Sequence, residues 1–222
     1  INKFSDTRCQ IDITCKWRNI EKYETNDMTN IIQASFDIEC TSIDGSFPQA
    51  TRPGDKIIQI GSTFNILGQK DCYYKSMITL NTCDLINDVD VIACETENKL
   101  IEEWCKMVLE QDPDIITGWN IFGFDEKYIY DRAVKLNIKD IVLQLGRVSD
   151  RKLKFIEKSL SSAALGDNKL YYFNMQGRVQ LDLMKVVQRD YNLDSYKLDN
   201  VSSHFLRGKI KEIIKSEESL SI

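Results

Sequence analysis

Hydrophobic and polar positions follow an order along the chain that predicts a mixed α/β fold. An apolar run over residues 31–40 has the length and composition of a buried strand, and two further strand-like segments follow near residues 56–67 and 72–80. Loops that contain Gly and Pro separate these segments. Over residues 97–111 the apolar side chains recur at spacings of three and four, which is the period of an amphipathic helix.

The pattern then predicts a crossover to a parallel strand. Asp112-Pro113 ends the helix, residues 114–119 form a short apolar strand, and another helix begins near Phe124. Three sequential strands can pair as an antiparallel meander, whereas a strand reached through a helix can lie parallel to the first. We therefore expect a ribonuclease-H-like α/β fold with a mixed sheet.

The first 30 residues differ from the rest of the chain. They contain one strand-like piece, residues 10–17, and then a polar passage rich in turn formers. We expect residues 1–30 to be the end of an N-terminal β-containing domain, and residues 31–222 to form the α/β domain, incomplete at its C-terminus. Because the first residue is Ile1 rather than Met and the chain ends in a charged stretch, we interpret the sequence as a piece of a longer protein.

Composition places few restrictions on function. A chain of 222 residues that is 42% hydrophobic can bury one substantial core. No apolar run reaches the roughly 18 residues of a membrane span, so we expect a soluble protein without a membrane partner. Seven cysteines without a C-x-x-C spacing favour reduced thiols inside a cell. The net charge of -5 gives no overall sign of nucleic-acid binding, and the basic stretch at residues 151–158 is either a phosphate-binding patch or a solvated face.

Two acidic residues in the first strand suggest a metal site. Asp37 and Glu39 are two positions apart, so their side chains point to the same face of the strand, about 6–7 Å apart along the backbone. Carboxylates held that close in a partly buried place repel each other and raise one pKa unless a cation or a donor balances them. A divalent metal is the simplest such cation. The alternative is a solvated strand face, which is the usual position of an isolated D-x-E pair.

The predicted topology adds a third carboxylate, because it places the end of the fourth strand beside the first. Asp125 can then reach Asp37 and Glu39. Three converging carboxylates fit the oxygen ligands of Mg²⁺, and two ions about 3.5–4 Å apart can support phosphodiester hydrolysis. We assign Asp37 as the ligand that bridges both ions, Glu39 to the ion that activates water, and Asp125 to the other ion. The alternative for Asp125 is an N-cap of the helix that starts there.

The segment before Asp125 contains an amide and an aromatic side chain suited to the end of a nucleic acid. Asn120 can bind a sugar or a phosphate, and Phe124 can stack on a base. The alternative is an Asn in a loop turn and a Phe in the core. Both interpretations stay open at the level of sequence.

These motifs resemble those of the 3′-5′ proofreading exonuclease domain of family B DNA polymerases, in particular the delta-type replicative enzymes and those of large DNA viruses. Phe36-Asp37-Ile38-Glu39-Cys40 is similar to the first exonuclease motif, and residues 112–120 with Phe124-Asp125 are similar to the second. The resemblance covers residues 9–206 and includes three further family landmarks, at residues 146–148, 177–182 and 195–198.

The resemblance implies roles for the same residues. Asp37, Glu39 and Asp125 would be the catalytic, metal-binding carboxylates, while Asn120 and Phe124 would contact the single-stranded 3′ end of the primer. The ions would be two Mg²⁺, with Mn²⁺ as an alternative. A β-hairpin within residues 149–176 would help to move the primer between sites.

The implied function is that of a fragment of a DNA-directed DNA polymerase, a nucleotidyltransferase, in which this part removes mispaired 3′ nucleotides. The implied partners are primer–template DNA, the missing polymerase domains of the same chain and a sliding-clamp processivity factor, in the nucleus or at a viral replication site.

The sequence also departs from the family pattern. The third family motif, Tyr-x-x-x-Asp, is absent from its place after the second, because Tyr196 and Asp199 are one position too close, and the palm and fingers signatures are missing. We therefore expect the fragment alone to be incomplete as an enzyme. The rival interpretations are a free-standing exonuclease of the same fold and a catalytically silent DNA-binding scaffold. Three converging acids argue against the silent scaffold, because without a function they only destabilise the fold.

Overall fold

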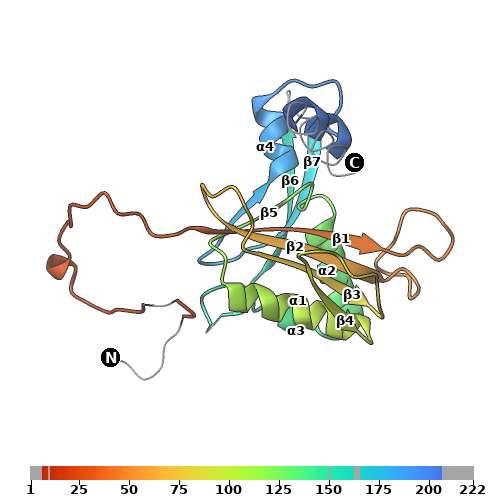
Figure 1. Cartoon of the computed structure of the whole chain (residues 1–222), viewed down its shortest axis with the longest axis horizontal. Helices are drawn as coiled ribbons and strands as arrows, with labels where there is room; N and C mark the ends of the chain where they lie inside the picture. Colours follow the sequence, from red (N-terminus) through yellow and green to blue (C-terminus); the bar gives the residue numbers. More distant parts are fainter. Residues whose placement is uncertain (1–6, 10, 150, 163–165, 207–222) are drawn as a thin grey trace, which may run out of the picture.

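A six-stranded mixed sheet is the centre of the structure, a computed structural model that describes residues 7–9, 11–149, 151–162 and 166–206 (Figure 1). Its strands are β1 (Ile32–Cys40), β2 (Ile57–Ile66), β3 (Tyr74–Leu80), β4 (Asp90–Cys94), β5 (Ile115–Gly118) and β8 (Val179–Asp182), in the order β4-β3-β2-β1-β5-β8. β2 is antiparallel to β1 and to β3, whereas β5 is parallel to β1. This pairing confirms the predicted meander and crossover, and with them the ribonuclease-H-like fold class.

Three helices pack together on one side of the sheet (Figure 1): α1 (Glu97–Gln111), α2 (Asp125–Lys135) and the short α3 (Lys139–Val142). α1 has the bounds that its hydrophobic period predicts. Its N-cap Thr96 accepts a hydrogen bond from Lys99 N at 3.3 Å, and it ends at Asp112, whose φ of 46° is left-handed. Trp104 packs on Phe36 with 5.1 Å between the ring centroids. This contact fixes α1 against β1.

The hydrophobic pattern does not predict β4 and β8. They have five and four residues, which is too short for a period of two to stand out. β4 pairs in parallel with β3, and β8 pairs in parallel with β5. Strands this short depend on the neighbouring strand more than on their own sequence.

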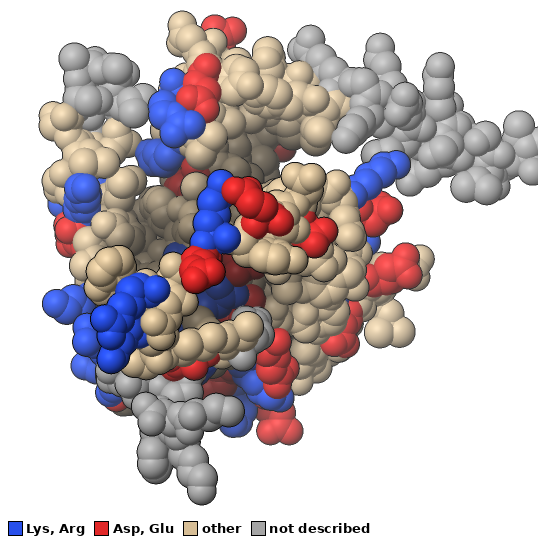
Figure 2. Space-filling view, turned by 90° about the vertical axis from the view of Figure 1, so that its left-hand side faces the viewer, with Lys and Arg blue, Asp and Glu red and all other residues tan. Residues whose placement is uncertain are grey.

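Charged side chains of both signs are interspersed on the face drawn in Figure 2. In the basic stretch at residues 151–158, the exposed Lys152 pairs with Asp140 at 2.8 Å, which is the behaviour of a solvated face. All seven cysteines are unpaired. Among the helices of the described residues, none combines the length and the apolar composition that a membrane span requires.

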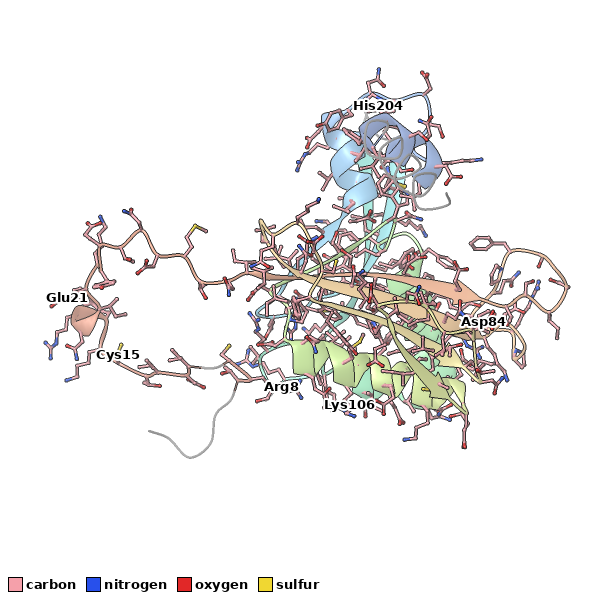
Figure 3. All side chains as sticks on the ribbon, viewed as in Figure 1. Arg8, Cys15, Glu21, Asp84, Lys106 and His204 are labelled. Carbon is pink, nitrogen blue, oxygen red and sulfur yellow. The ribbon has the colours of Figure 1, made fainter. Side chains whose placement is uncertain are left out.

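Residues 11–17 do not form the strand that their pattern predicts. Residues 11–16 have no regular structure, and η1 (Trp17–Asn19) is a single 3₁₀ turn. The arm that carries Cys15 and Glu21 runs away from the sheet (Figure 3). A strand needs a partner for its N–H and C=O groups, and none of the described residues pairs with this segment as a strand. The domain boundary near residue 30 stays a prediction.

A two-stranded hairpin, β6 (Phe155–Ser162) and β7 (Gly166–Phe173), forms a separate sheet. It falls within residues 149–176, the range in which the family resemblance implies a hairpin. α4 (Leu183–Asp190) lies beside it (Figure 1), and Lys185 Nζ donates to Asn168 Oδ1 at 2.9 Å. A further helical segment at residues 198–206 carries His204 (Figure 3).

An ion-pair network anchors the N-terminal end of β5. Asp112 Oδ1 accepts hydrogen bonds from Arg147 Nε at 2.9 Å and from Arg178 Nη1 at 2.7 Å. Asp114 accepts from Arg147 Nη1 at 2.8 Å and, through its other oxygen, from Ile32 N at 2.9 Å. Two of the family landmarks, those that contain the arginines, therefore hold this end of the strand.

A buried ion pair joins α1, α2 and the loop between β1 and β2. Arg132 and Glu97 are 1% and 4% exposed, and Arg132 Nε donates to Glu97 Oε1 at 2.7 Å. Arg132 Nη1 also donates to the carbonyl oxygens of Ala50 and Arg52, at 2.9 and 2.8 Å. Glu97 Oε1 in turn accepts from Ile57 N at 2.9 Å. Each charge is hydrogen-bonded on several sides, which is the condition for a stable buried pair.

We expect Arg132→Met to lower the free energy of unfolding by about 3–5 kcal/mol, because Glu97 would keep its charge in the core without its cationic partner. Urea unfolding followed by circular dichroism measures the change. Lys99→Met is the matched control, because Lys99 pairs with Glu102 on the surface of α1 and such pairs contribute roughly 0–1 kcal/mol. If Arg132→Met lost no more than the control, the pair would not be what joins these elements.

Candidate active site

Asp37 and Glu39 lie on one face of β1, as their spacing predicts. Phe36 and Ile38 point to the opposite face and are buried in the core. Asp37 and Glu39 are exposed and stand near the C-terminal end of the strand. The alternation of burial along β1 follows from the period of two in a strand.

β5 brings the second motif to this end of β1. The register places Ser35 beside Thr117, so that β5 ends next to Phe36. A Cβ on Gly118 would lie 2.5 Å from Phe36 O and 2.5 Å from Ile121 Cγ2, so only glycine fits at this position. The loop that follows β5 therefore turns directly against β1.

Asp125 lies where these elements meet. It is the first residue of α2 and is 2% exposed. Its Oδ1 accepts a hydrogen bond from Ile38 N at 3.2 Å, and its carboxyl shares a hydrogen bond with the carboxyl of Asp37. The N-cap of α2 is Phe124, which makes no side-chain cap bond. Asp125 is therefore not the cap of its helix, and its side chain is turned to β1.

Burial and mutual repulsion raise the pKa values of both aspartates. Burial raises the pKa of Asp125 to about 7, and the charges of Asp37 and Asp182 add to the effect. Partial burial of its carboxyl, and then the charge of Glu39, raise the pKa of Asp37. No Lys or Arg in the described part of the chain forms an ion pair with Asp37 or Asp125.

The three predicted metal ligands are brought together only in part. Within the described ranges, no group of three or more His, Cys, Asp or Glu side chains is arranged to hold an ion. Asp37 and Asp125 are in contact, whereas Glu39 acts on Asp37 through its charge. Two of the carboxyls therefore meet, and the third lies two positions along the same strand.

Asn120 belongs to the loop that connects β5 to Asp125. Its backbone is left-handed, with a φ of 60°, and its carbonyl accepts from Gly123 N at 2.9 Å and from Phe124 N at 3.0 Å. Its side chain lies over Gly123, where a Cβ would overlap with it. Asn120 therefore shapes the turn, and its contact with a nucleic acid stays a prediction.

Phe124 is half-buried and stands at the edge of the site. Its ring centroid lies 5.2 Å from that of Tyr128 and 5.3 Å from that of Phe47. Phe47 is 73% exposed and comes from the loop between β1 and β2. The sequence gives no signal for this pairing, because Phe47 lies in a loop far from the second motif. The two rings form an aromatic edge that the spacing of the motifs does not predict.

Asp182 is a second residue that the motif spacing does not select for the site. Its carboxylate accepts from the backbone N–H groups of Asn120 and Phe122, both at 3.1 Å, and from Met184 N at 3.0 Å as the N-cap of α4. It therefore holds the loop that carries Asn120 against β8. The available signal is an Asp directly before an apolar helix, which is the usual pattern of an N-cap.

A cavity of about 480 Å³ opens on the Asp37 side of the sheet. Its lining includes Asp37, Thr63, Met77, Ile86, Trp119 and Leu198. These residues come from β1, β2, β3 and three connecting or helical segments, and the volume falls within the range of about 300–1,000 Å³ that is usual for small-molecule sites. Asp37 therefore borders a cavity of the size of a small-molecule site.

Residues 2–201 match the family described as DNA polymerase family B, exonuclease domain. The chain belongs to this family. The match covers the whole sheet, both exonuclease-like motifs and the hairpin, and it confirms the resemblance inferred from the motifs. Exonuclease domains of family B DNA polymerases are nucleases that act on DNA.

The chain is similar to parts of much longer DNA polymerases. The DNA polymerase of Pyramimonas orientalis virus is 60% identical over 158 residues, which are 71% of this chain and 13% of that protein. The DNA polymerase of Acanthamoeba polyphaga mimivirus is 32% identical over an alignment of length 279, which covers 94% of this chain and 16% of that protein. The DNA polymerase delta catalytic subunit of Glycine max is 35% identical over 209 residues, 92% of this chain and 19% of that protein. The exonuclease domain described here thus spans 13 to 19% of the length of these curated relatives.

We expect the stability of the family B exonuclease domain without divalent ions to fall as the pH rises from about 4 to 7. Because the fold raises the pKa of Asp125 from 3.8 to about 7, the folded state binds more protons than the unfolded state in this window. Asp125→Asn removes this titration, and its amide oxygen can still accept from Ile38 N. The melting temperature of Asp125→Asn minus that of wild type is the quantity to follow. This difference should be at least about 2 °C larger at pH 8 than at pH 4.

Differential scanning calorimetry in the presence of a chelator measures this difference. Asp71→Asn, in an exposed turn between β2 and β3, is the matched control. A difference between Asp125→Asn and wild type that stays constant over the whole pH range would contradict the electrostatic account of the site.

Proposed function

We propose that this chain hydrolyses phosphodiester bonds at the 3′ end of single-stranded DNA, and that it proofreads for a family B DNA polymerase. The observation that carries the proposal is the contact between the carboxyls of Asp37 and Asp125, at a place where no Lys or Arg of the described residues balances them. Buried carboxyls that repel each other destabilise the fold, and such an arrangement is typical of a functional site. Its position at the ends of β1 and β5 is open to the cavity beside Asp37.

The acidic residues fit divalent ions. Asp37, Glu39 and Asp125 would hold two Mg²⁺, with Mn²⁺ as an alternative, because hard cations prefer carboxylate oxygens. Burial, and then the charges of neighbouring carboxyls, raise the pKa values of the two aspartates, and a bound cation would offset both effects. When bound, the ions would supply an activated water and charge stabilisation for the leaving oxygen. Asp182 would keep the loop that leads to Asp125 in place through its backbone hydrogen bonds.

The exposed aromatic edge would bind the strand to be cut. Phe124 and Phe47 offer ring faces on which any base can stack, and Asn120 would contact a sugar or phosphate at the turn. Stacking of this kind accepts a single strand without reading its sequence. Mispaired ends fray more readily than paired ones, so a single-strand site would remove errors preferentially.

In the intact protein, DNA-directed DNA synthesis would take place in polymerase domains outside this chain. The relatives are named DNA polymerases, and this chain matches 13 to 19% of their length. Primer–template DNA, those domains and a sliding-clamp processivity factor would be its partners, in the nucleus or at a viral replication site. The hairpin would take part in moving the primer, and residues 1–30 would belong to an N-terminal β-containing domain.

We expect the full-length protein, without nucleoside triphosphates, to release nucleotides from a mismatched 3′ end when Mg²⁺ is present. Asp37→Ala with Glu39→Ala should slow the release by about 10² or more, because the ions lose two of their ligands. Single-turnover assays on labelled primer–template DNA measure the rates. Glu102→Ala with Glu103→Ala, two acids on the partly exposed face of α1, is the matched control and should keep the wild-type rate.

The rival interpretations give different results. A silent scaffold would bind single-stranded DNA and release nothing, with or without Mg²⁺. A free-standing exonuclease would release nucleotides but would not extend a primer when nucleoside triphosphates are added. Release that persists unchanged in the double variant would contradict the assignment of these carboxylates.

A further inference from the structure

Glu126 is a buried carboxyl that the proposed hydrolysis does not use. It follows Asp125 in the first turn of α2 and is 1% exposed. Its Oε2 accepts a hydrogen bond from Phe173 N at 2.7 Å, and its Oε1 accepts from the side-chain amide of Gln180. The carboxyl therefore depends for its hydrogen bonds on β7 and β8, which lie about fifty residues further along the chain.

β7 docks the hairpin onto the second motif through one of its edges. Tyr171 N donates to Phe122 O at 2.8 Å, and Phe173 N, two positions further, donates to Glu126. Alternate residues of a strand direct their N–H groups to the same edge, so β7 pairs with β6 on one side and with the site elements on the other. The hairpin thus behaves as an additional strand laid against the loop and helix that carry Asp125.

Aromatic contacts extend this docking along α2. The rings of Tyr130 and Phe155 are stacked with 4.0 Å between their centroids, and Phe173 lies edge-on to both. Lys127 Nζ lies 5.2 Å from the centroid of the Tyr171 ring. The hairpin therefore covers the face of α2 on which Glu126 and Tyr130 lie.

Two consecutive carboxyls fix the first turn of α2 from opposite directions. Asp125 is bonded to Ile38 N of β1, and Glu126 is bonded to Phe173 N of the hairpin. If the hairpin moved away alone, Oε2 of Glu126 would lose the Phe173 N donor and stay buried, which is unfavourable, while Gln180 of β8 would still donate to Oε1. The hairpin and the first turn of α2 are therefore expected to move together.

We propose that Glu126 is a positioning residue through which docking of the β6–β7 hairpin sets the place of Asp125 against Asp37. The catalytic part of this inference rests on the proposed exonuclease function, whereas the coupling itself does not. A docked hairpin holds Asp125 in register with β1. An undocked hairpin releases it, so hydrolysis depends on the position of the hairpin.

Hydrogen exchange tests the coupling without any measurement of activity. Glu126→Leu removes both acceptors at similar volume, whereas Glu126→Gln keeps an acceptor for Phe173 N. In Glu126→Leu, peptides that contain Phe173 and peptides that contain Ile38 should both exchange about tenfold faster or more, and Glu126→Gln should resemble wild type. Glu110→Leu, on the exposed end of α1, is the matched control. Faster exchange at Phe173 with unchanged exchange at Ile38 would overturn the proposal.

Excision kinetics of the full-length protein test the catalytic consequence. Glu126→Leu should lower the single-turnover rate about 10- to 100-fold while the Kd for a single-stranded 3′ end changes less than about threefold, because a small displacement of a reacting group is enough for such a loss. Glu126→Gln should restore the rate to within about threefold of wild type. A wild-type rate in Glu126→Leu, or an equal loss in both variants, would overturn the positioning role.

A further variant and the independence of the exchange experiment cover the cases in which Glu126→Leu does not fold or wild type is inactive. If Glu126→Leu does not fold, Glu126→Leu with Gln180→Leu replaces both side chains by apolar ones and leaves no orphaned side-chain amide, so that only the Phe173 N–H loses its acceptor, and the same outcomes decide the question. If wild type releases no nucleotides, the proposed function fails, while the exchange experiment still decides whether the hairpin and Asp125 are coupled.

Discussion

The close parallel pairing of β1 with β5 is the constraint on which the candidate site depends. Gly118 leaves no room for a Cβ between the carbonyl of Phe36 and the side chain of Ile121, so the backbones can approach and the next loop turns against β1. α1, which leads into β5, is held to the same strand by the contact between Trp104 and Phe36. A wider spacing between β1 and β5 at Gly118 would separate the motif that contains Asp37 from the motif that contains Asp125.

The charges of acidic side chains are compensated at one end of β5 and not at the other. At the N-terminal end, Asp112 and Asp114 meet arginine side chains, and their charges are compensated by ion pairs. At the C-terminal end, Asp37 and Asp125 meet each other, and the pKa of Asp125 rises to about 7. The first arrangement stabilises the strand. The second leaves buried negative charge without a cationic partner among the described residues, and this contrast is the basis on which we propose a metal site there.

Buried carboxylates also organise the backbone around the site. Asp182 accepts N–H groups from the loop after β5, and Glu126 accepts one from the hairpin. Each satisfies backbone donors that lie outside regular helix or sheet pairing, and unsatisfied buried donors are unfavourable. The irregular segments near Asp125 are therefore ordered by acids that need not touch a substrate. They connect β8 and the hairpin by hydrogen bonds to the segments that carry Asn120 and Asp125.

The features that depend on backbone period alone were determined by the sequence. The bounds of α1, the strands that contain Ile60 and Ile78, and the shared face of Asp37 and Glu39 all follow from repeats of 3.6 or 2 residues, which act between near neighbours in the chain. The order of these elements was sufficient to predict the parallel crossover and the approach of Asp125.

Only the tertiary structure decided which partners the polar groups meet. Residues 11–17 have the alternation of a strand, yet no described residue pairs with them in that way. The local sequence of Asp125 taken alone favoured an N-cap, whereas in the structure its carboxyl is turned to β1 and accepts from Ile38 N. The roles of Phe47, Glu126 and Asp182 depend on contacts across tens of residues. Local geometry is set by the repeat of the backbone, whereas burial and hydrogen-bond partners are set by segments that meet only after the chain has folded.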